Sequence, residues 1–294
     1  MDDNLFPGSP GAASFVAIGD SFTEGLNDPA PGGGFRGWAD RLAGLLAAEY
    51  PDLRYANLAV RGKLLRQIVA EQVPPAAAMS PGLVSIAGGG NDILRPGADP
   101  DTLAELFDVA VARLRQAGCR VLMFTGFDPV GVPVLRRLRG RIAAYDMHLR
   151  AIADERGCDL VDMWSMRFLR DKNAWSADRL HLSAESHRRV ALRAAEVLGV
   201  AVAEDWRAPS GAAAVPGGLE AVAKTLAGAG TETGALARPG VARAAWVAAR
   251  REDAKWAREY LLPWVNRRLH GTSSGDGLPP KRPELLPVTA PTPT

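Results

Sequence analysis

The chain has 294 residues, of which 47% are apolar and 23% are charged. That length and composition suit a globular protein with one sizeable α/β domain and an extension. The 35 basic and 33 acidic residues nearly cancel, and the short basic clusters are spread along helical segments. This distribution argues against nucleic acid as a partner.

The amino-terminal residues carry no recognisable targeting signal. MDDNLFPGSPGAASF has two acidic residues directly after Met1 and has neither a basic region nor an apolar run of secretory-signal length. No stretch approaches the roughly 18 uninterrupted apolar residues that span a bilayer. We therefore expect a cytoplasmic protein without a membrane anchor, in which residues 1–13 form a tail; the oligomeric state stays unknown at this level.

Short apolar runs alternate with helical patterns from residue 14 to residue 203. The runs typical of strands are, in chain order, SFVAIGD, LRYANLAV, GLVSIAGG, CRVLMFTGF and CDLVDMW. Apolar residues recur at helical spacing over residues 36–50, 63–72, 101–117, 138–156 and 183–198. This alternation predicts a three-layer α/β/α domain over residues 14–203, with a five-stranded parallel sheet covered by helices on both faces.

The composition changes after residue 203. Residues 204–270 are expected to form a helical extension, which begins with a connector rich in Ala, Gly and Pro. Trp246, Trp256 and Tyr260 fall on one helical stripe, continued by Trp264, and aromatic side chains of this size favour burial. We expect this stripe to dock on the larger domain or on a second subunit. Residues 271–294, rich in Pro, Gly, Ser and Thr, are expected to be a flexible tail.

The two cysteines, Cys119 and Cys158, each lie just before a predicted strand. In a parallel sheet they could lie near one another at the same edge. In a reducing cytoplasm we expect two buried thiols, with a disulfide as the alternative.

A candidate nucleophile follows the first predicted strand. In VAIGDSFTEG the strand runs directly into Gly19-Asp20-Ser21 and a turn, which places Ser21 at the edge where open α/β sheets hold their ligands. A serine hydroxyl needs a base within hydrogen-bond reach and donors for the developing oxyanion. Taken alone, Gly-Asp-Ser is more often an ordinary turn.

A candidate acid–base pair follows the last predicted strand. In WSADRLHLSAESH, Asp178 and His181 are three residues apart in a loop before a helix that Ser183 can cap. A carboxylate that accepts from one imidazole nitrogen leaves the other nitrogen free to take a serine proton. Alone, Asp-x-x-His is more often a pair on a surface loop.

Two further loops offer hydrogen-bond donors. VSIAGGGNDIL ends a strand in three glycines before Asn91, whose side-chain amide is a good oxyanion donor. The alternative is a glycine-rich turn in which Asn91 caps the next element. In LAVRGK, Gly62 after a strand could offer its backbone amide to the same oxyanion.

These four blocks, in this order and at this spacing, resemble those of the SGNH/GDSL hydrolase family. The resemblance covers about residues 14–200 and implies a flavodoxin-like sheet. It implies Ser21 as nucleophile, His181 as general base and Asp178 as the acid that orients it. It also implies an oxyanion hole formed by the backbone amides of Ser21 and Gly62 and the side chain of Asn91.

The chain departs from the family's usual pattern at one motif residue and carries further histidines outside the motifs. Phe22 replaces the leucine of GDSL, at a position expected to pack rather than react. His148 is expected at the surface or partly packed, His187 on the helix after the Asp178 loop, and His270 at the start of the tail. These histidines lack metal-ligand spacing with acids or cysteines, so we predict no metal and no cofactor.

The motifs together predict a serine esterase or acylhydrolase that cleaves carboxylic esters of a small-molecule substrate through an acyl-serine intermediate. Without an obvious amphipathic lid segment, short acyl chains are the expected preference. Carbohydrate O-deacetylation and acyl transfer to an alcohol would use the same groups and are the alternatives among enzymes. From another class, the alternative is a noncatalytic binding module on the same fold, which the retained Ser21 and His181 argue against.

Overall fold

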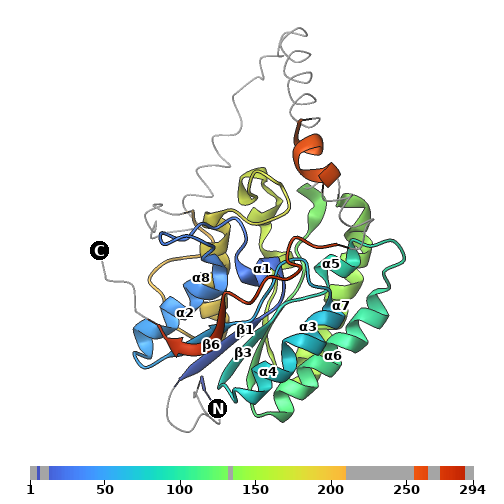
Figure 1. Cartoon of the computed structure of the whole chain (residues 1–294). Coiled ribbons are helices and arrows are strands. Elements are labelled where there is room, and N and C mark those ends of the chain that lie inside the picture. The colour runs from blue at the N-terminus through green and yellow to red at the C-terminus, as the bar shows by residue number, and fades with distance from the viewer. Residues whose placement is uncertain (1–4, 7–12, 132–134, 210–254, 264–271, 289–294) are drawn as a thin grey trace, which may run out of the picture. The chain divides into compact units, whose positions relative to one another are not determined.

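A computed structural model describes residues 5–6, 13–131, 135–209, 255–263 and 272–288. The chain divides into two compact units, one formed by Met1–Pro209 with Ser273–Thr294 and the other by Ser210–Thr272. The first unit contains the sheet, its helices and all four motif blocks. Its α/β architecture is the predicted one (Figure 1).

The sheet of the first unit has six strands in the order β5-β4-β3-β1-β2-β6. Neighbours among the first five pair in parallel, and their 2-1-3-4-5 arrangement is that of flavodoxin-like folds. The five parallel strands lie where the apolar runs predicted them: β1 Ser14–Ile18, β2 Arg54–Asn57, β3 Leu83–Ile86, β4 Arg120–Phe124 and β5 Asp159–Val161.

Helices cover both faces of this sheet. The longer ones match the predicted helical patterns closely: α2 Gly37–Glu49, α3 Leu65–Glu71, α6 Pro100–Gln116, α7 Arg139–Arg156 and α8 Ala184–Leu198. Three helices are shorter: α1 Ser21–Glu24 follows β1, α4 Val73–Ala78 follows α3, and α5 Gly90–Ile93 follows β3. Short 3₁₀ turns occupy Pro129–Gly131, Arg136–Leu138, Met163–Ser165, Arg167–Arg170 and Lys172–Ala174.

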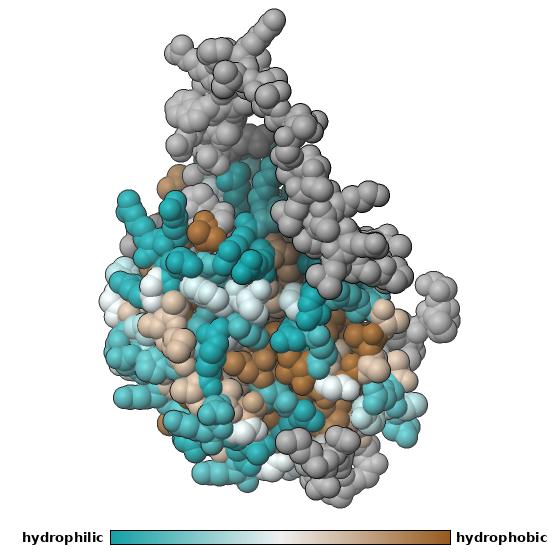
Figure 2. Space-filling view, turned by 180° about the vertical axis from the view of Figure 1, so that it is seen from behind, coloured by the Kyte–Doolittle hydropathy of each residue, from teal (hydrophilic) through white to brown (hydrophobic). Residues whose placement is uncertain are grey.

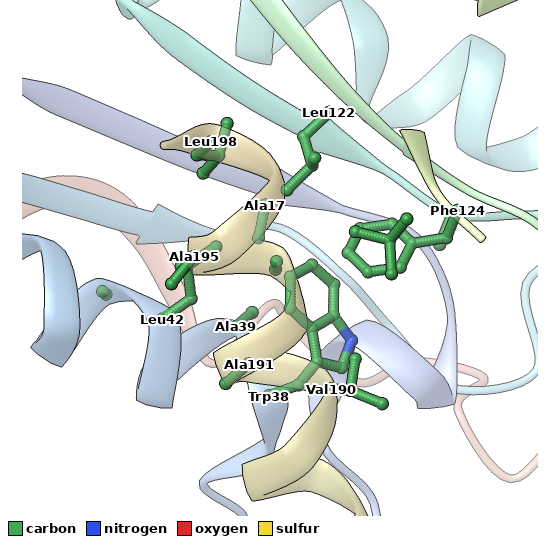
Figure 3. Close-up of a cluster of buried hydrophobic side chains, with 14 of the residues drawn as sticks. Ala17, Trp38, Ala39, Leu42, Leu122, Phe124, Val190, Ala191, Ala195 and Leu198 are labelled. Carbon is green, nitrogen blue, oxygen red and sulfur yellow. The ribbon is translucent and has the colours of Figure 1, made fainter. Parts of the chain in front are cut away.

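Two hydrophobic cores lie on opposite faces of the sheet. Successive residues of β1 alternate between them: Phe15 and Ala17 pack with α2 and α8, whereas Val16 and Ile18 pack with α3, α4, α6 and α7. In the first core, Trp38 lies among side chains of β1, β4 and α8 (Figure 3), and its ring centroid is 4.3 Å from that of Phe124. Complete burial of Trp38 fixes α2 against the sheet.

The sixth strand corrects the prediction of a flexible tail over residues 271–294. Arg282–Pro287 forms β6, which pairs antiparallel with β2 at the edge of the sheet. Pro283 and Pro287 lack the N–H of other residues, and an edge strand tolerates this because one side of its backbone needs no partner strand. The Pro content that predicted a tail is therefore compatible with this edge position.

The second unit is described only over residues 255–263 and Thr272. A π-helical turn spans Ala257–Leu261, Trp256 is buried, and Tyr260 is exposed. Trp246 and Trp264 of the predicted stripe lie outside the described residues, and docking of the stripe stays a prediction.

The surface of the described chain is mostly polar on one face (Figure 2), and neither of its cysteines is in a disulfide. On the face shown in Figure 2, hydrophilic side chains cover much of the described surface, with hydrophobic residues gathered between them. Within the described residues, no helix is long and apolar enough to cross a membrane. Cys119 is buried, Cys158 is half-buried, and both are free thiols.

Candidate active site

Ser21 lies just beyond the carboxyl end of β1, at the first residue of α1. Asp20 caps this helix, because its Oδ1 accepts the N–H of Phe22 at 3.1 Å. The buried side chain of Gln72 holds the backbone of Gly19: it accepts the N–H at 2.7 Å and donates to the carbonyl at 2.9 Å. Sequence reasoning did not identify Gln72, which is 53 residues away along the chain. The turn that carries the serine is thus supported from the neighbouring layer.

Asp178 and His181 lie in one loop before α8, and Ser183 caps that helix as predicted by accepting the N–H of Ser186. His181 Nδ1 lies 2.6 Å from Asp178 Oδ2, and His181 Nε2 lies 3.1 Å from Ser21 Oγ. The serine and the histidine are 160 residues apart in the sequence. The fold therefore brings the three predicted residues into one chain of hydrogen-bond contacts.

Several donors surround the carboxylate of Asp178. Its Oδ1 accepts the backbone N–H groups of Leu180 at 2.9 Å and His181 at 3.0 Å, and the hydroxyl of Ser176 at 2.7 Å. Burial alone would raise the pKa of Asp178, but the hydrogen bonds and charge of His181, with these backbone groups, hold that pKa well below its usual range. Asp178 is therefore an anion at neutral pH.

Asn27 is a neighbour of this carboxylate that sequence reasoning missed. Its Nδ2 donates to Asp178 Oδ2 at 2.7 Å and to Ser176 Oγ at 2.9 Å. The Asn27 backbone has a φ of 69°, in the left-handed region that asparagine tolerates better than most residues. The contact between Asn27 and a residue 151 positions later has no local signal in the sequence.

The two further predicted donors lie in the loops after β2 and β3. Gly62 has a φ of 75°, and Asn91 stands in α5 at the carboxyl edge of the sheet. The Asn91 amide nitrogen donates to Asp20 Oδ2 at 3.0 Å and to the carbonyl of Lys63 at 3.1 Å. Asn91 therefore joins the loops that carry Ser21 and Gly62.

Unlike the Asn91 amide, the backbone N–H groups of Ser21 and Gly62 have no hydrogen-bond acceptor among the described residues. Backbone N–H groups without a protein acceptor, in the segments that follow β1 and β2, are suited to bind an anionic oxygen. His181 is 23% exposed and Asp178 14% exposed at their side chains, so the histidine is the more accessible of the pair.

A buried histidine, His187, stacks on Phe22, the residue that follows Ser21. The Phe22 ring packs against those of Trp38, Phe124 and His187, with the nearest centroid 5.4 Å away, so the half-buried Phe22 packs against the core as expected. His187 Nδ1 accepts the backbone N–H of Trp38 at 3.2 Å, and burial lowers the pKa of His187 to about 4. Neutral His187 is thus a structural acceptor.

The other histidines do not enter the site as described. His148 is 43% exposed and its Nε2 lies 2.8 Å from Asp101 Oδ1, which agrees with the predicted surface position. His270 lies outside the described residues. Among the described residues, no group of three or more His, Cys, Asp and Glu side chains is arranged to hold a metal ion.

The model of the GDSL-like lipase/acylhydrolase family matches residues 17–189, more than half of the chain. The matched range includes all four motif blocks and the Asp–His–Ser contacts. The chain belongs to this family. This membership makes the GDSL protein a serine hydrolase that acts on ester bonds.

Solved structures share the fold of this GDSL protein. An acetylxylan esterase from Geobacillus stearothermophilus has 24% identity and a TM-score of 0.55, with 68% of this chain and 97% of that chain covered. An α/β-hydrolase enzyme from the metagenome of Lake Arreo, Spain, has 24% identity and a TM-score of 0.55, with 64% and 97% covered. TesA has 24% identity and a TM-score of 0.52, with 63% and 97% covered. A comparison with curated proteins found no match.

Proposed function

We propose that this GDSL hydrolase cleaves carboxylic esters through an acyl-serine intermediate, with Ser21, His181 and Asp178 as the catalytic groups. The observation that carries the proposal is the continuous contact from Asp178 Oδ2 through both His181 ring nitrogens to Ser21 Oγ, at 2.6 and 3.1 Å. Ionised Asp178 accepts the Nδ1–H and so orients the ring. The free Nε2 then accepts the proton of the Ser21 hydroxyl.

In the first step, Ser21 Oγ attacks the ester carbonyl while its proton passes to His181 Nε2. The tetrahedral intermediate collapses when His181 returns this proton to the departing alkoxide, and the alcohol leaves. In the second step, water loses a proton to His181 and attacks the carbonyl of the acyl-serine. The second tetrahedral intermediate collapses when His181 returns this proton to Ser21 Oγ, which releases the carboxylic acid and restores the Ser21 hydroxyl.

The proposed oxyanion hole consists of the N–H groups of Ser21 and Gly62 and the side chain of Asn91. The two backbone donors are supported by their lack of a protein acceptor within the described residues. The amide of Asn91 bonds to Asp20 and Lys63 in this structure. In our proposal it exchanges one of these bonds for the oxyanion in the transition state, where an oxyanion donor acts.

The proposed substrates are small esters with short acyl groups, from acetyl to butyryl. The chain shows no obvious amphipathic lid segment between the motif blocks, which favours a shallow site open to small acyl groups. Carbohydrate O-acetyl groups have the same chemistry at the carbonyl, so acetylated sugars belong among the substrates to be tested.

Activity profiling with full-length protein tests this function. The panel contains 4-nitrophenyl esters from acetyl to palmitoyl and acetylated xylo-oligosaccharides, with a Ser21→Ala variant as the matched control. We expect hydrolysis of short acyl esters by the wild type and almost none by Ser21→Ala, whose fold is intact by circular dichroism. No hydrolysis of any ester by the wild type would favour the noncatalytic binding module instead.

A further inference from the structure

The carboxyl-terminal residues 273–281, here called the strap, lie against the loop that carries Gly62. In Figure 1 this segment is the red trace that runs toward β6. Ser273 Oγ donates to the carbonyl of Arg61 at 3.3 Å. The strap and the Gly62 loop approach so closely that neither Gly62 nor Gly275 has room for a side chain. A Cβ added to Gly62 would lie 1.8 Å from Ser273 Oγ, and one added to Gly275 would lie 2.0 Å from the Arg61 carbonyl oxygen.

The other end of the strap is anchored by one ammonium group. Lys281 Nζ donates to the carbonyl of Glu24 at 2.6 Å, to those of Phe35 and Arg36 at 3.0 Å each, and to the carboxylate of Asp40 at 2.5 Å. The chain then enters β6 and pairs with β2. These bonds hold the strap to the end of α1, whose last residue is Glu24, and to the residues around the start of α2.

The Glu24 side chain connects this anchor to the Gly62 loop. Its carboxylate accepts the backbone N–H of Arg61 at 2.8 Å and also binds the Arg61 guanidinium. The helix that begins at Ser21, the Arg61–Gly62 backbone and the strap thus form one connected network. Because the peptide between Arg61 and Gly62 contains both the carbonyl bonded to Ser273 and the Gly62 N–H, movement of one reorients the other.

We propose that the strap is a positioning element for the oxyanion hole, which aims the Gly62 N–H by packing against the Arg61–Gly62 peptide from outside the motif region. The inference rests on the proposed function, since it assigns a role to Gly62 in ester hydrolysis. It gives a supporting role to the Ser273–Gly275 contact and the Lys281 anchor, which lie more than 200 residues from Gly62 and beyond the family match that ends at residue 189. The strap residues themselves do not touch the reacting atoms in this proposal.

Gly275→Ala in the full chain tests the contact directly, because the new methyl group would push the Arg61 carbonyl away. The matched control is Gly277→Asn: Gly277 has a φ of 76°, which asparagine tolerates, and nothing lies within 4 Å of an added Cβ. We expect Gly275→Ala to lower kcat on a short acyl ester by on the order of ten- to hundredfold, with KM changed less than about twofold. Gly277→Asn should keep wild-type kcat.

A second variant, Lys281→Met, releases the anchor without adding bulk at Gly62. It should lower kcat in the same direction as Gly275→Ala, while thermal unfolding shows that both variants remain folded at the assay temperature. Wild-type kcat in both variants would overturn the inference. An equal loss of kcat in the Gly277→Asn control would also overturn it, because the strap would then act only through general stability. An inactive wild type would instead contradict the proposed function and the inference together.

Discussion

Asn27 is the residue whose replacement probes the support of Asp178 most selectively. Its amide reaches the same carboxylate oxygen, Oδ2, that faces His181 Nδ1. Asn27→Gly removes this donor and keeps the left-handed backbone, which glycine adopts without strain. Asn27→Asp has nearly the same shape but replaces the donor by a second carboxylate. The two variants therefore separate loss of a hydrogen bond from added charge.

The expected magnitudes differ between these variants. A hydrogen bond to a charged group contributes about 1.5–3 kcal/mol. If about 1.4 kcal/mol of it acts on the orientation of His181 in the transition state, Asn27→Gly lowers kcat roughly tenfold. Two carboxylates at the 2.7 Å separation of this hydrogen bond repel by about 6 kcal/mol at an effective dielectric constant of about 20. This repulsion raises the pKa of the new carboxyl rather than that of Asp178, whose pKa is held low, so the protonated Asn27→Asp side chain still donates to Asp178 at low pH. Once the new carboxyl ionises at higher pH, kcat falls by on the order of a hundredfold or more.

The assay measures kcat and KM on a short acyl ester from pH 5 to pH 9, together with thermal unfolding. Asn27→Asp should lose more activity than Asn27→Gly at pH 9, where the new carboxyl is ionised, and less at pH 5, where its protonated form still donates to Asp178. Wild-type kcat in both variants would show that Asn27 does not support the role proposed for Asp178. Equal losses in both would show that added charge next to Asp178 has no effect on catalysis.

Two other residues give independent predictions. Asn91→Ala should lower kcat by on the order of a hundredfold with a smaller change in KM; unchanged turnover would leave Asn91 as a residue that only joins loops. His187 has a pKa lowered to about 4 by burial, against about 6.5 in the unfolded chain. The folded state then binds fewer protons, so stability is full above pH 6.5 and falls by about 3 kcal/mol as the pH drops to 4. Thermal midpoints measured at pH 4.5 and 7.5 should show this loss in the wild type and less of it in His187→Gln.

Most of the sheet and its helices could be predicted from the sequence, because each element has a local signature. Strands buried on both faces give continuous apolar runs, and the amphipathic helices that cover them repeat every three or four residues. β6 had no such signature. Arg282–Pro287 contains two prolines and lies largely exposed, and it pairs with Arg54–Asn57 more than 200 residues earlier. Only the three-dimensional contact makes these residues a strand.

In the candidate site, the motif residues could be predicted from the sequence, whereas the residues that support them could not. Ser21, Gly62, Asn91, Asp178 and His181 could be proposed because each lies in a short motif after a strand, and parallel strands bring such loops to one edge. The residues that support them have no comparable pattern. Asn27, Gln72 and Lys281 act through single side chains that reach across the fold, at separations of 53 to 257 residues. Such contacts depend on packing, which local spacing does not encode.

Mass spectrometry of the full-length protein after reaction with a fluorophosphonate tests most directly whether Ser21 is the nucleophile. The reagent forms a covalent bond with an activated serine, as an ester substrate does in the proposed mechanism. We expect a single adduct on the peptide that contains Ser21, formed with the same time course as the loss of esterase activity. We expect no adduct in Ser21→Ala and slow labelling in a His181→Ala variant. An adduct on a different serine, or ester hydrolysis that continues at the wild-type rate in Ser21→Ala, would contradict the proposed role of Ser21.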